Sequence, residues 1–361
     1  MNLFANKFNY SRRIEMKKTL VVAAGLAVLS TSAFASKARM QAMGQDATLG
    51  SYYMEDTRNI WRMPHSLNSN SNFVITEWGP QAGAAQADEN AEGGFFNSSA
   101  SLNYGIYLNA DALGNVQADT AGNLPTRFDL FLGGNSNMNW GARLGYETIT
   151  NKTATLDEEA SGFDFSVSAE LSGANVFLTY VASADATITG QSEQNNDLAL
   201  GATYMMNDYT LFGEYSSEGN AGDADATTSI TVGAGRRMEM SDSATVFYDV
   251  KLVSTSDQAI TGQPTATDSS QLSLPVTFGV EAKATSWLTM RASISQPIIS
   301  NEEYTLSSNT IESSSRSTTL GVGASLTYGN LQLDGTLSNA NQGTLGASDD
   351  VISNVSMTYV F

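Results

Sequence analysis

The chain has 361 residues, of which 37 are Asp or Glu and 18 are Lys or Arg, so its net charge at pH 7 is −19. The absence of cysteine excludes a disulfide scaffold, a zinc–thiolate site and a cysteine nucleophile. The acidic balance argues against nucleic-acid binding, because no sustained basic surface is available to neutralise phosphates. Hydrophobic residues make up 41 % of the chain, which is low for a globular domain, although Tyr and Phe are numerous.

Residues 1–35 have the features of an N-terminal extension followed by a secretory signal peptide. Two lysines precede an apolar stretch of about eleven residues, and Ala33 and Ala35 fit the small residues of a cleavage site before Ser36. The apolar stretch is too short to cross a bilayer as a helix, which needs about 20 residues. We therefore expect export and cleavage after Ala35. Cleavage would remove five basic residues and one acidic residue, which changes the net charge from −19 to −23.

Residues 36–78 are the least strand-like part of the exported chain. They resemble the N-terminal plug of the long-chain fatty-acid transporter family, whose members are fourteen-stranded barrels with a small domain inside the lumen. The resemblance is carried by Arg39, Ala42-Met43-Gly44, Asp56 and Pro64. That family usually has Asn-Pro-Ala where this chain has Met63-Pro64-His65. The resemblance implies a lumen plug, whereas a flexible periplasmic leader is the alternative.

From residue 79 onward the chain repeatedly alternates apolar and polar residues, which is the pattern of β-strands with one apolar face. In the run Phe163–Leu171, apolar residues occupy every second position and two of the intervening residues are acidic. An antiparallel β-sandwich also alternates, but its strands average about five to six residues, whereas a tilted membrane strand needs about 9–11. Short turns also alternate with long acidic or Ser/Thr/Gly-rich segments, as expected when only one end of a barrel faces the periplasm.

We therefore expect an all-β fold, a transmembrane antiparallel up-and-down β-barrel over residues 79–361, with about 14 strands and 16 as the alternative. An even number follows if both ends of the barrel lie in the periplasm. Residues 72–78 (NFVITEW) form a run too brief to span alone. They would raise the count to sixteen if they paired with a hidden partner near Tyr52-Tyr53. The expected runs begin near residues 95, 126, 139, 162, 174, 197, 208, 228, 243, 271, 286, 316, 330 and 351.

The last residues place an aromatic side chain at the C-terminus and apolar side chains at the alternate positions before it, namely Val355, Met357, Tyr359 and Phe361. This pattern closely resembles the C-terminal signal of Gram-negative outer-membrane β-barrel proteins, including porins. The resemblance implies a multi-pass barrel in the cell outer membrane. It also implies periplasmic chaperones and a barrel-assembly machinery that reads the terminal strand.

Charged residues on the polar face of the runs are candidates for the lining of a pore, because lipid-facing positions must be apolar. The candidates are Arg127, Asp129, Arg143, Glu147, Asp164, Glu170, Glu214, Asp249, Lys251, Glu281, Lys283, Arg291 and Asp334. They predict a porin that allows passive diffusion of small hydrophilic solutes through a water-filled lumen. Because acidic residues outnumber basic ones, we expect a mild preference for cations.

Two alternatives to a porin stay open at this stage. One is a plugged fatty-acid-type transporter of hydrophobic substrates, which would need an apolar pocket beneath the outer loops. Inward Phe131, Phe177, Phe212 and Phe247 are candidates for such a pocket. The other is a structural or surface-adhesion barrel.

No catalytic residue, metal site or cofactor is expected. His65 is the only histidine and lies outside the strand runs, which excludes a Ser–His nucleophile on the barrel wall. The acidic clusters have no Ca²⁺-loop spacing and are interpreted as solvated loops. The expected partners are outer-membrane lipid, lipopolysaccharide and small hydrophilic solutes, with no nucleic acid. A homo-oligomer is an open alternative.

Overall fold

The computed structural model describes residues 36–80, 89–99, 101–110, 125–152, 157–186, 196–219, 226–257, 267–306, 309–314, 317–341 and 354–361. The chain divides into two compact units, residues 1–33 and 34–361, and all of the described residues belong to the second. The expected signal peptide, with Ala33 and Ala35, lies outside the described residues and stays a prediction. Ser36 is the first residue described.

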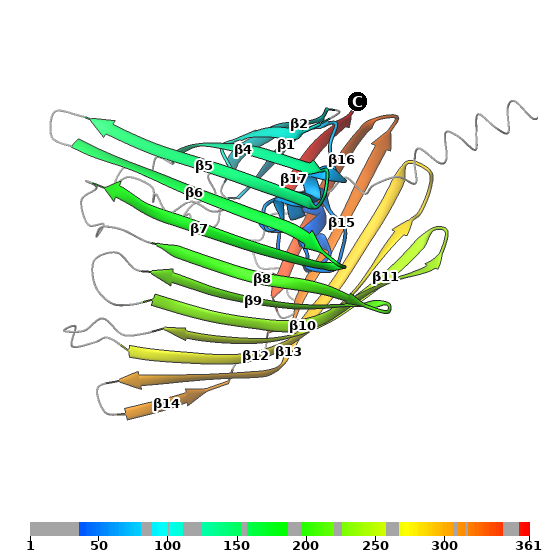
Figure 1. The fold of residues 1–361 in the computed structure, drawn as a ribbon. Helices are drawn as coiled ribbons and strands as arrows, with labels where there is room; N and C mark the ends of the chain where they lie inside the picture. Colours follow the sequence, from blue (N-terminus) through cyan, green and yellow to red (C-terminus); the bar gives the residue numbers. More distant parts are fainter. Residues whose placement is uncertain are drawn as a thin grey trace, which may run out of the picture. The chain divides into compact units, whose positions relative to one another are not determined.

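Antiparallel strands make up most of the described chain, and three short helices precede them (Figure 1). The helices are α2 (Lys37–Ala42), η1 (Thr57–Ile60) and η2 (Pro64–Asn68). The strands are β1 (Phe73–Pro80), β2 (Glu89–Ser98), β3 (Asn103–Leu108), β4 (Thr126–Asn135), β5 (Asn139–Lys152), β6 (Asp157–Leu171), β7 (Ala174–Ala186), β8 (Asp197–Met206), β9 (Tyr209–Gly219), β10 (Ala226–Ser241), β11 (Ala244–Asp257), β12 (Thr267–Lys283), β13 (Leu288–Leu306), β14 (Asn309–Ser313), β15 (Thr319–Tyr328), β16 (Leu331–Asn341) and β17 (Asn354–Val360).

The strands form one closed sheet. Each strand pairs with its neighbours in the chain, and β1 pairs antiparallel with both β2 and β17, so the ring has no free edge. The short β14 and the following β15 pair with different parts of β13 and together act as one interrupted strand. The closed wall therefore has 16 strands.

The count of sixteen corrects the expected fourteen for two reasons. The run beginning near residue 95 is two strands, β2 and β3, which pair with each other, and the Ser99 N–H donates to the Leu102 carbonyl between them at 3.1 Å. The brief run 72–78 is also part of the wall, as β1, so the barrel begins at Phe73 rather than at residue 79. Its partners are β2 and β17, whereas Tyr52 and Tyr53, near which a partner was expected, lie outside the strands.

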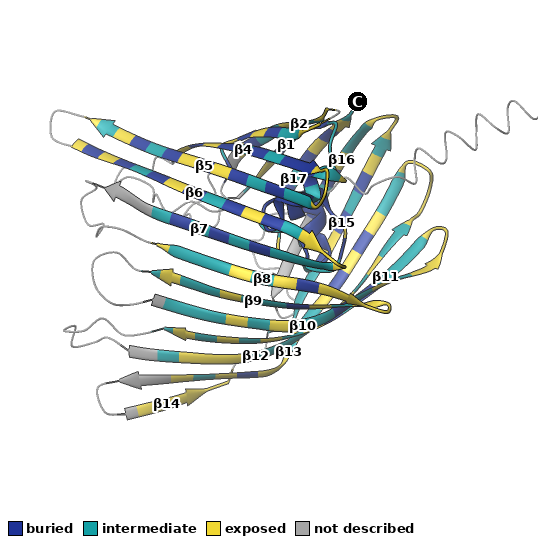
Figure 2. Ribbon diagram, viewed as in Figure 1, coloured by how far each residue is buried: buried dark blue, intermediate teal, exposed yellow. Residues whose placement is uncertain are grey.

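Alternate residues of each strand face opposite sides of the wall, because successive side chains of a strand point in opposite directions. Figure 2 shows the resulting bands of buried and exposed residues along β4, β5 and β6. Large apolar side chains are exposed on one face of nearly every strand, for example Leu144 on β5, Val167 on β6 and Leu252 on β11. The opposite face carries the buried polar and charged residues.

The two ends of the barrel differ in their connections. Turns of a few residues join β4 to β5, β6 to β7, β8 to β9, β10 to β11, β12 to β13 and β15 to β16, all at one end. The start of β1 and Phe361 lie at this same end, which we call the short-turn end. The longer connections are at the other end and fall mostly outside the described residues. Within the described ranges, no helix has the length and apolar character needed to cross a membrane.

Candidate functional site

Residues 36–72 lie on the inner side of the barrel, and we call this segment the plug. Hydrogen bonds join it to β1, β2, β4, β5, β6, β9, β11, β12, β13, β16 and β17. In Figure 1 the blue plug is enclosed by the strands. The segment therefore contacts the wall on opposite sides of the lumen.

Local sequence determines the three helices of the plug. Ser36 caps α2, because its hydroxyl accepts a hydrogen bond from the Arg39 backbone N–H at 3.1 Å. Asp56 caps η1 in the same way, with its carboxylate 2.8 Å from the Arg58 backbone nitrogen. Pro64 begins η2, where its missing N–H is not needed.

An apolar core holds the plug to the strands at the beginning of the barrel. Trp61 and Leu67 of the plug are fully buried against Phe73, Ile75, Phe96, Tyr107 and Phe131. The Trp61 ring makes edge-on contacts with the rings of Tyr107 and Phe131, each at 5.1 Å. We call the contact of residues 57–72 with β1–β7 the anchored edge.

The η2 helix continues the anchored edge onto β5, β6 and β7. The His65 backbone N–H donates to the Ser168 hydroxyl at 2.9 Å. The ring nitrogens lie 2.8 Å from the same hydroxyl and 3.1 Å from the Asn175 side-chain oxygen. The plug comes so close to Gly141 that a Cβ there would overlap the Pro64 carbonyl carbon. Burial lowers the pKa of His65, so the neutral ring is favoured.

Arg58 adds a buried charge contact to the anchored edge. Its Nη1 lies 2.8 Å from the Glu77 carboxylate and 3.2 Å from that of Glu92. The Tyr107 hydroxyl donates to Glu77 at 2.6 Å, and the guanidinium also lies over the Trp61 ring. Lys37 Nζ also lies 2.8 Å from Glu92, so two plug cations are paired with these two buried wall carboxylates.

Arg62 holds the plug to β9. Its Nε lies 3.2 Å from the Glu214 carboxylate, to which Tyr52 also donates at 2.9 Å. The Arg62 guanidinium lies over the Tyr52 ring, which in turn stacks on Phe212 at 4.5 Å. Burial and the neighbouring Glu214 raise the pKa of Tyr52 above its usual value, so its hydroxyl stays a donor.

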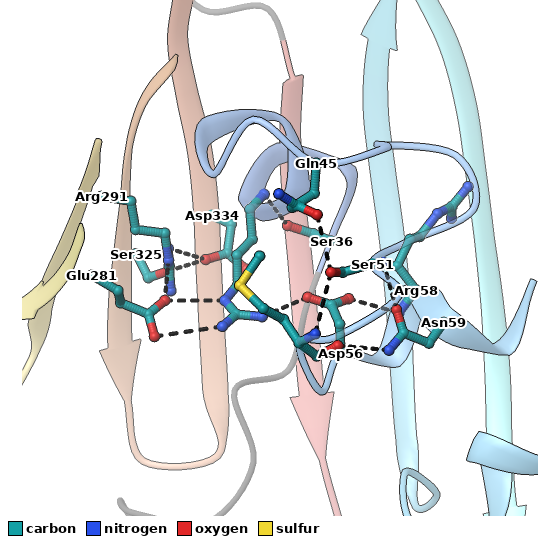
Figure 3. Close-up of polar contacts among 12 residues, drawn as sticks. Ser36, Gln45, Ser51, Asp56, Arg58, Asn59, Glu281, Arg291, Ser325 and Asp334 are labelled. Carbon is teal, nitrogen blue, oxygen red and sulfur yellow. Dashed lines mark hydrogen bonds and ion pairs between the residues drawn. The ribbon is translucent and has the colours of Figure 1, made fainter. Parts of the chain in front are cut away.

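Arg39 connects α2 to Asp56 in the plug and to Glu281 in the wall. Figure 3 labels both carboxylates. Arg39 Nη1 lies 2.5 Å from Asp56, and Arg39 Nε lies 3.1 Å from Glu281 on β12. Glu281 is also 2.5 Å from Arg291 Nε on β13, and Arg291 forms a second ion pair with Asp334 at 3.3 Å. Burial raises the pKa of Asp56 to about 7, although the Arg39 charge acts in the opposite direction.

The α2 backbone packs directly on β13, β15, β16 and β17. Thr336 donates to the Ala38 carbonyl at 2.6 Å, and Ser293 donates to the Ala42 carbonyl at 2.9 Å. A Cβ on Gly321 would lie 2.7 Å from the Ala42 carbonyl oxygen, so glycine allows the close approach. We call the contact of residues 36–44 with β12–β17 the α2 edge.

A cluster of five charged residues lies on the inner face of β4, β5 and β6, next to the plug. Arg127 lies 2.9 Å from Asp129 and 2.5 Å from Asp164, and its other contact is Glu147 at 3.4 Å. Arg143 lies 2.7 Å from Asp129 and is also paired with Asp164. Its guanidinium is 5.5 Å from the Trp61 ring centre. These five expected pore-lining residues are buried and paired with one another.

The remaining expected pore-lining residues fall into two groups. Asp249 accepts hydrogen bonds from Gln45 at 3.0 Å and Tyr53 at 2.9 Å, and Lys251 lies 3.9 Å from it. With Glu214, Glu281, Arg291 and Asp334, they line the wall beside the plug. Glu170 and Lys283 are exposed near the short-turn end, and Glu170 accepts a hydrogen bond from Asn139 at 3.1 Å.

Several plug-binding wall residues were missed from the sequence, namely Glu77, Glu92, Tyr107 and Asn175. The run that contains Glu77 is apolar on both faces, so alternation could not show which face is inward. A lone carboxylate in such a run was the available signal for an inward charge contact.

The four phenylalanines considered for an apolar pocket are buried. Phe131 packs on Trp61, Phe212 stacks on Tyr52, and Phe247 contacts Met40, Met43 and Met54 of the plug. Phe177 fills the space above Gly201, where a Cβ would overlap its ring. Three of the four rings are thus used to hold the plug.

The C-terminal strand β17 places Met357 and Tyr359 on the exposed, outer face, with Val355 half-buried on the same side. Phe361 follows the strand and stacks on Phe95 of β2 at 5.6 Å, across the closure of the barrel. Val355, Met357 and Tyr359 therefore share the outer face of β17, as expected. Recognition of this strand by an assembly machinery stays a prediction.

Comparison with known proteins finds solved structures of low sequence identity to this chain. No protein-family model matches the chain, and no curated protein matches it. A mutant porin from Rhodopseudomonas blastica aligns over 81 % of this chain and 99 % of its own, with 11 % identity and a TM-score of 0.34. OccAB3 from Acinetobacter baumannii aligns over 80 % and 98 %, with 7 % identity and a TM-score of 0.36. A bacterial polysaccharide outer membrane secretin aligns over 80 % and 97 %, with 9 % identity and a TM-score of 0.45.

The function must therefore be inferred from the chain itself. Among the residues that the structure describes, no group of three or more His, Asp or Glu side chains is placed to hold a metal ion. What the described residues form is a barrel with an apolar outer face, a charged inner face and a plug bonded to that inner face.

Proposed function

We propose that the chain is an outer-membrane channel through which small hydrophilic solutes diffuse, and that the plug controls its lumen. The observation that carries this proposal is the opposite chemistry of the two faces of a closed wall. Exposed apolar side chains cover the outside, and charged side chains cover the inside. A closed sheet with these faces satisfies every backbone group within the wall and suits a bilayer on the outside and water within.

The outer face supports a membrane location in detail. Exposed Leu, Val, Ile and Phe occur on successive strands around the ring, which is far more apolar surface than a water-soluble protein exposes in one region. Aromatic residues such as Tyr209, Trp287 and Tyr328 are exposed near the short-turn end. Tyr and Trp residues near one end of a membrane-spanning barrel are typical of the membrane–water interface.

The inner face supports a hydrophilic solute. Hydroxyl and carboxylate groups of Ser229, Thr255 and Asp257 lie on the inner face of β10 and β11, farther from the short-turn end than the plug contacts. A wall of this kind replaces part of the hydration shell of a polar solute. The acidic balance favours cations over anions.

The proposal is tested by inserting the purified, folded protein into planar bilayers under a salt gradient. We expect discrete channel events and a reversal potential of the sign that indicates cation preference. Folded protein that produces no channel events, including after removal of the plug, would refute the channel function. An anion-selective reversal potential would refute the preference but not the channel.

A fatty-acid-type transporter is a weaker candidate. The wall has sixteen strands rather than the fourteen of that family, and three of the four candidate pocket rings are occupied by plug contacts. No described observation favours surface adhesion. Interaction with lipopolysaccharide and recognition of the terminal strand by an assembly machinery belong to the same proposal as the membrane location.

A further inference from the structure

The plug is bonded to the wall differently at its two edges, and this difference locates a path through the lumen. We propose that solutes pass along the inner wall of β12–β16 when α2 withdraws from it, while residues 57–72 stay docked at the anchored edge. This inference rests on the proposed channel function and adds the place of the path and the part of the plug that moves.

The ion pairs that α2 makes with the wall can separate without leaving a wall carboxylate unpaired. Lys37 Nζ lies 2.8 Å from Glu92, and Glu92 keeps Arg58 at 3.2 Å. Arg39 lies 3.1 Å from Glu281, but it also has Asp56 at 2.5 Å within the plug. Glu281 in turn has Arg291 at 2.5 Å within the wall. The large cost of breaking a buried ion pair comes from the charge left uncompensated. Here Arg39 keeps Asp56 within the plug, and Glu281 keeps Arg291 within the wall. Figure 3 labels Asp56, Glu281 and Arg291.

The other contacts of α2 are also of a kind that water or sliding can replace. Thr336 and Ser293 donate to α2 carbonyl groups, and water can take the place of either partner. The apolar contact consists of Met40 and Met43 against Phe247, and methionine adapts readily to a changed surface. Gly44 follows α2 with a φ of 64°, so a residue with a permissive backbone stands where the segment would bend.

The contacts of the anchored edge cannot be broken and replaced in this way. Withdrawal there would expose the fully buried Trp61 and Leu67 and open the aromatic core to water. It would also take Arg58 away from both Glu77 and Glu92 at once. Residues 69–72 connect this part of the plug directly to β1, which shortens any movement it can make.

The wall that α2 covers is suited to a hydrated path. Ser293, Ser325 and Thr336 provide hydroxyl groups along it, and Gly321 leaves space. Glu281, Arg291 and Asp334 also lie along it, and Lys283 follows Glu281 on the same face of β12, so this wall carries charges of both signs.

Two matched cross-links test the inference in the full-length protein, which has no native cysteine. The first joins α2 to the wall through Gln41→Cys and Asn354→Cys, whose native side chains are hydrogen-bonded. The second joins the anchored edge to β3 through Asn68→Cys and Asn103→Cys, a hydrogen-bonded amide pair at 2.7 Å. Each pair is bridged with a short bifunctional thiosulfonate, and conductance in planar bilayers is recorded before bridging, after it, and after reduction.

We expect the α2 cross-link to abolish conductance and reduction to restore it, while the Asn68–Asn103 cross-link leaves conductance unchanged. Loss of conductance with both cross-links would mean that the whole plug must leave, and would overturn the inference. Unchanged conductance with the α2 cross-link would mean that the path does not depend on movement of α2, and this would also overturn the inference. If neither variant conducts even when reduced, and the plug-deleted protein does not conduct either, the channel function itself fails.

Discussion

At the anchored edge the plug is held by an aromatic core, whereas α2 is held by hydroxyl groups, methionines and the ion pairs of Lys37 and Arg39. Trp61 at the first edge and Arg39 at the second are both almost fully buried. Burial alone therefore does not separate a fixed contact from a releasable one. What separates them is whether each partner keeps a satisfactory neighbour after the contact is broken.

The largest expected effect comes from breaking the anchored edge. Arg58→Ala leaves the paired Glu77 and Glu92 without this cation, and we expect it to destabilise plug docking by about 3–5 kcal/mol. Docking is measured by protease protection of the plug in the folded barrel. Restored protection in an Arg58→Ala protein that also carries Glu77→Gln and Glu92→Gln would confirm the electrostatic cause. Full protection of the single variant would contradict it.

Trp61→Ala tests the apolar part of the same edge. Removal of a buried tryptophan that contacts Tyr107 and Phe131 is expected to cost about 3–5 kcal/mol of docking free energy. The comparison variant is Met43→Leu at the α2 edge, which conserves volume and is expected to cost less than about 1.5 kcal/mol. Equal loss of protection in the two variants would remove the distinction between the edges.

Gly321→Ala acts on the α2 edge from the wall side. The added methyl group would lie 2.7 Å from the Ala42 carbonyl oxygen, so we expect α2 to be displaced at a cost of about 1–3 kcal/mol. The measurement is the open probability in planar bilayers, which should rise. Gly335→Ala is the control, because a Cβ at Gly335 meets no atom within 4 Å. A rise in both variants would point to a general disturbance of the wall.

Glu281→Gln should have a smaller effect than Arg58→Ala. Arg39 keeps Asp56, so we expect a loss of about 1.5–3 kcal/mol, typical of one hydrogen bond to a charged group. The open probability should rise modestly while protection of residues 57–72 stays unchanged. Loss of protection across the whole plug would show that the two edges act as one unit.

The smallest expected effect is a pH dependence from His65. Its pKa is lowered by burial, so the unfolded segment takes up a proton more readily than the docked one. The contribution of neutral His65 to the stability of the docked plug is complete above pH 6.5. It is lost as the pH falls below that value toward the lowered pKa. Protection of η2 should weaken on acidification, and His65→Gln should remove the His65 part of that change. An identical pH profile in the variant would exclude His65 as its source.

Alternation predicted the outer and inner faces of the long strands, because one buried face and one lipid face impose a period of two. It placed the five residues of the Arg127 cluster on one face without showing that they pair. It failed at β1, where Phe73 and Ile75 face an apolar plug core while Val74 and Trp78 are exposed outside. With both faces apolar, alternation could not predict the strand's role, and the lone carboxylate of Glu77 was the one available signal for its inward face.

The contacts of the plug could not be predicted for a further reason. Arg39 and Glu281 are 242 positions apart in the chain, and their meeting depends on the register of the strands between them. The residues of the plug were visible as a segment that does not form strands, but their partners were not. The first and the last strands of the barrel both contact the plug only because β1 pairs with β17 and closes the ring.

The central claim is that residues 36–72 obstruct a conducting lumen. The most direct measurement compares single-channel conductance of the full chain with that of a chain lacking residues 36–70, after both barrels are shown to be folded by circular dichroism. The account predicts a sharp rise in conductance when the segment is deleted, because its contacts span opposite walls. An unchanged conductance would contradict the account and would identify the segment as a leader that does not control the lumen.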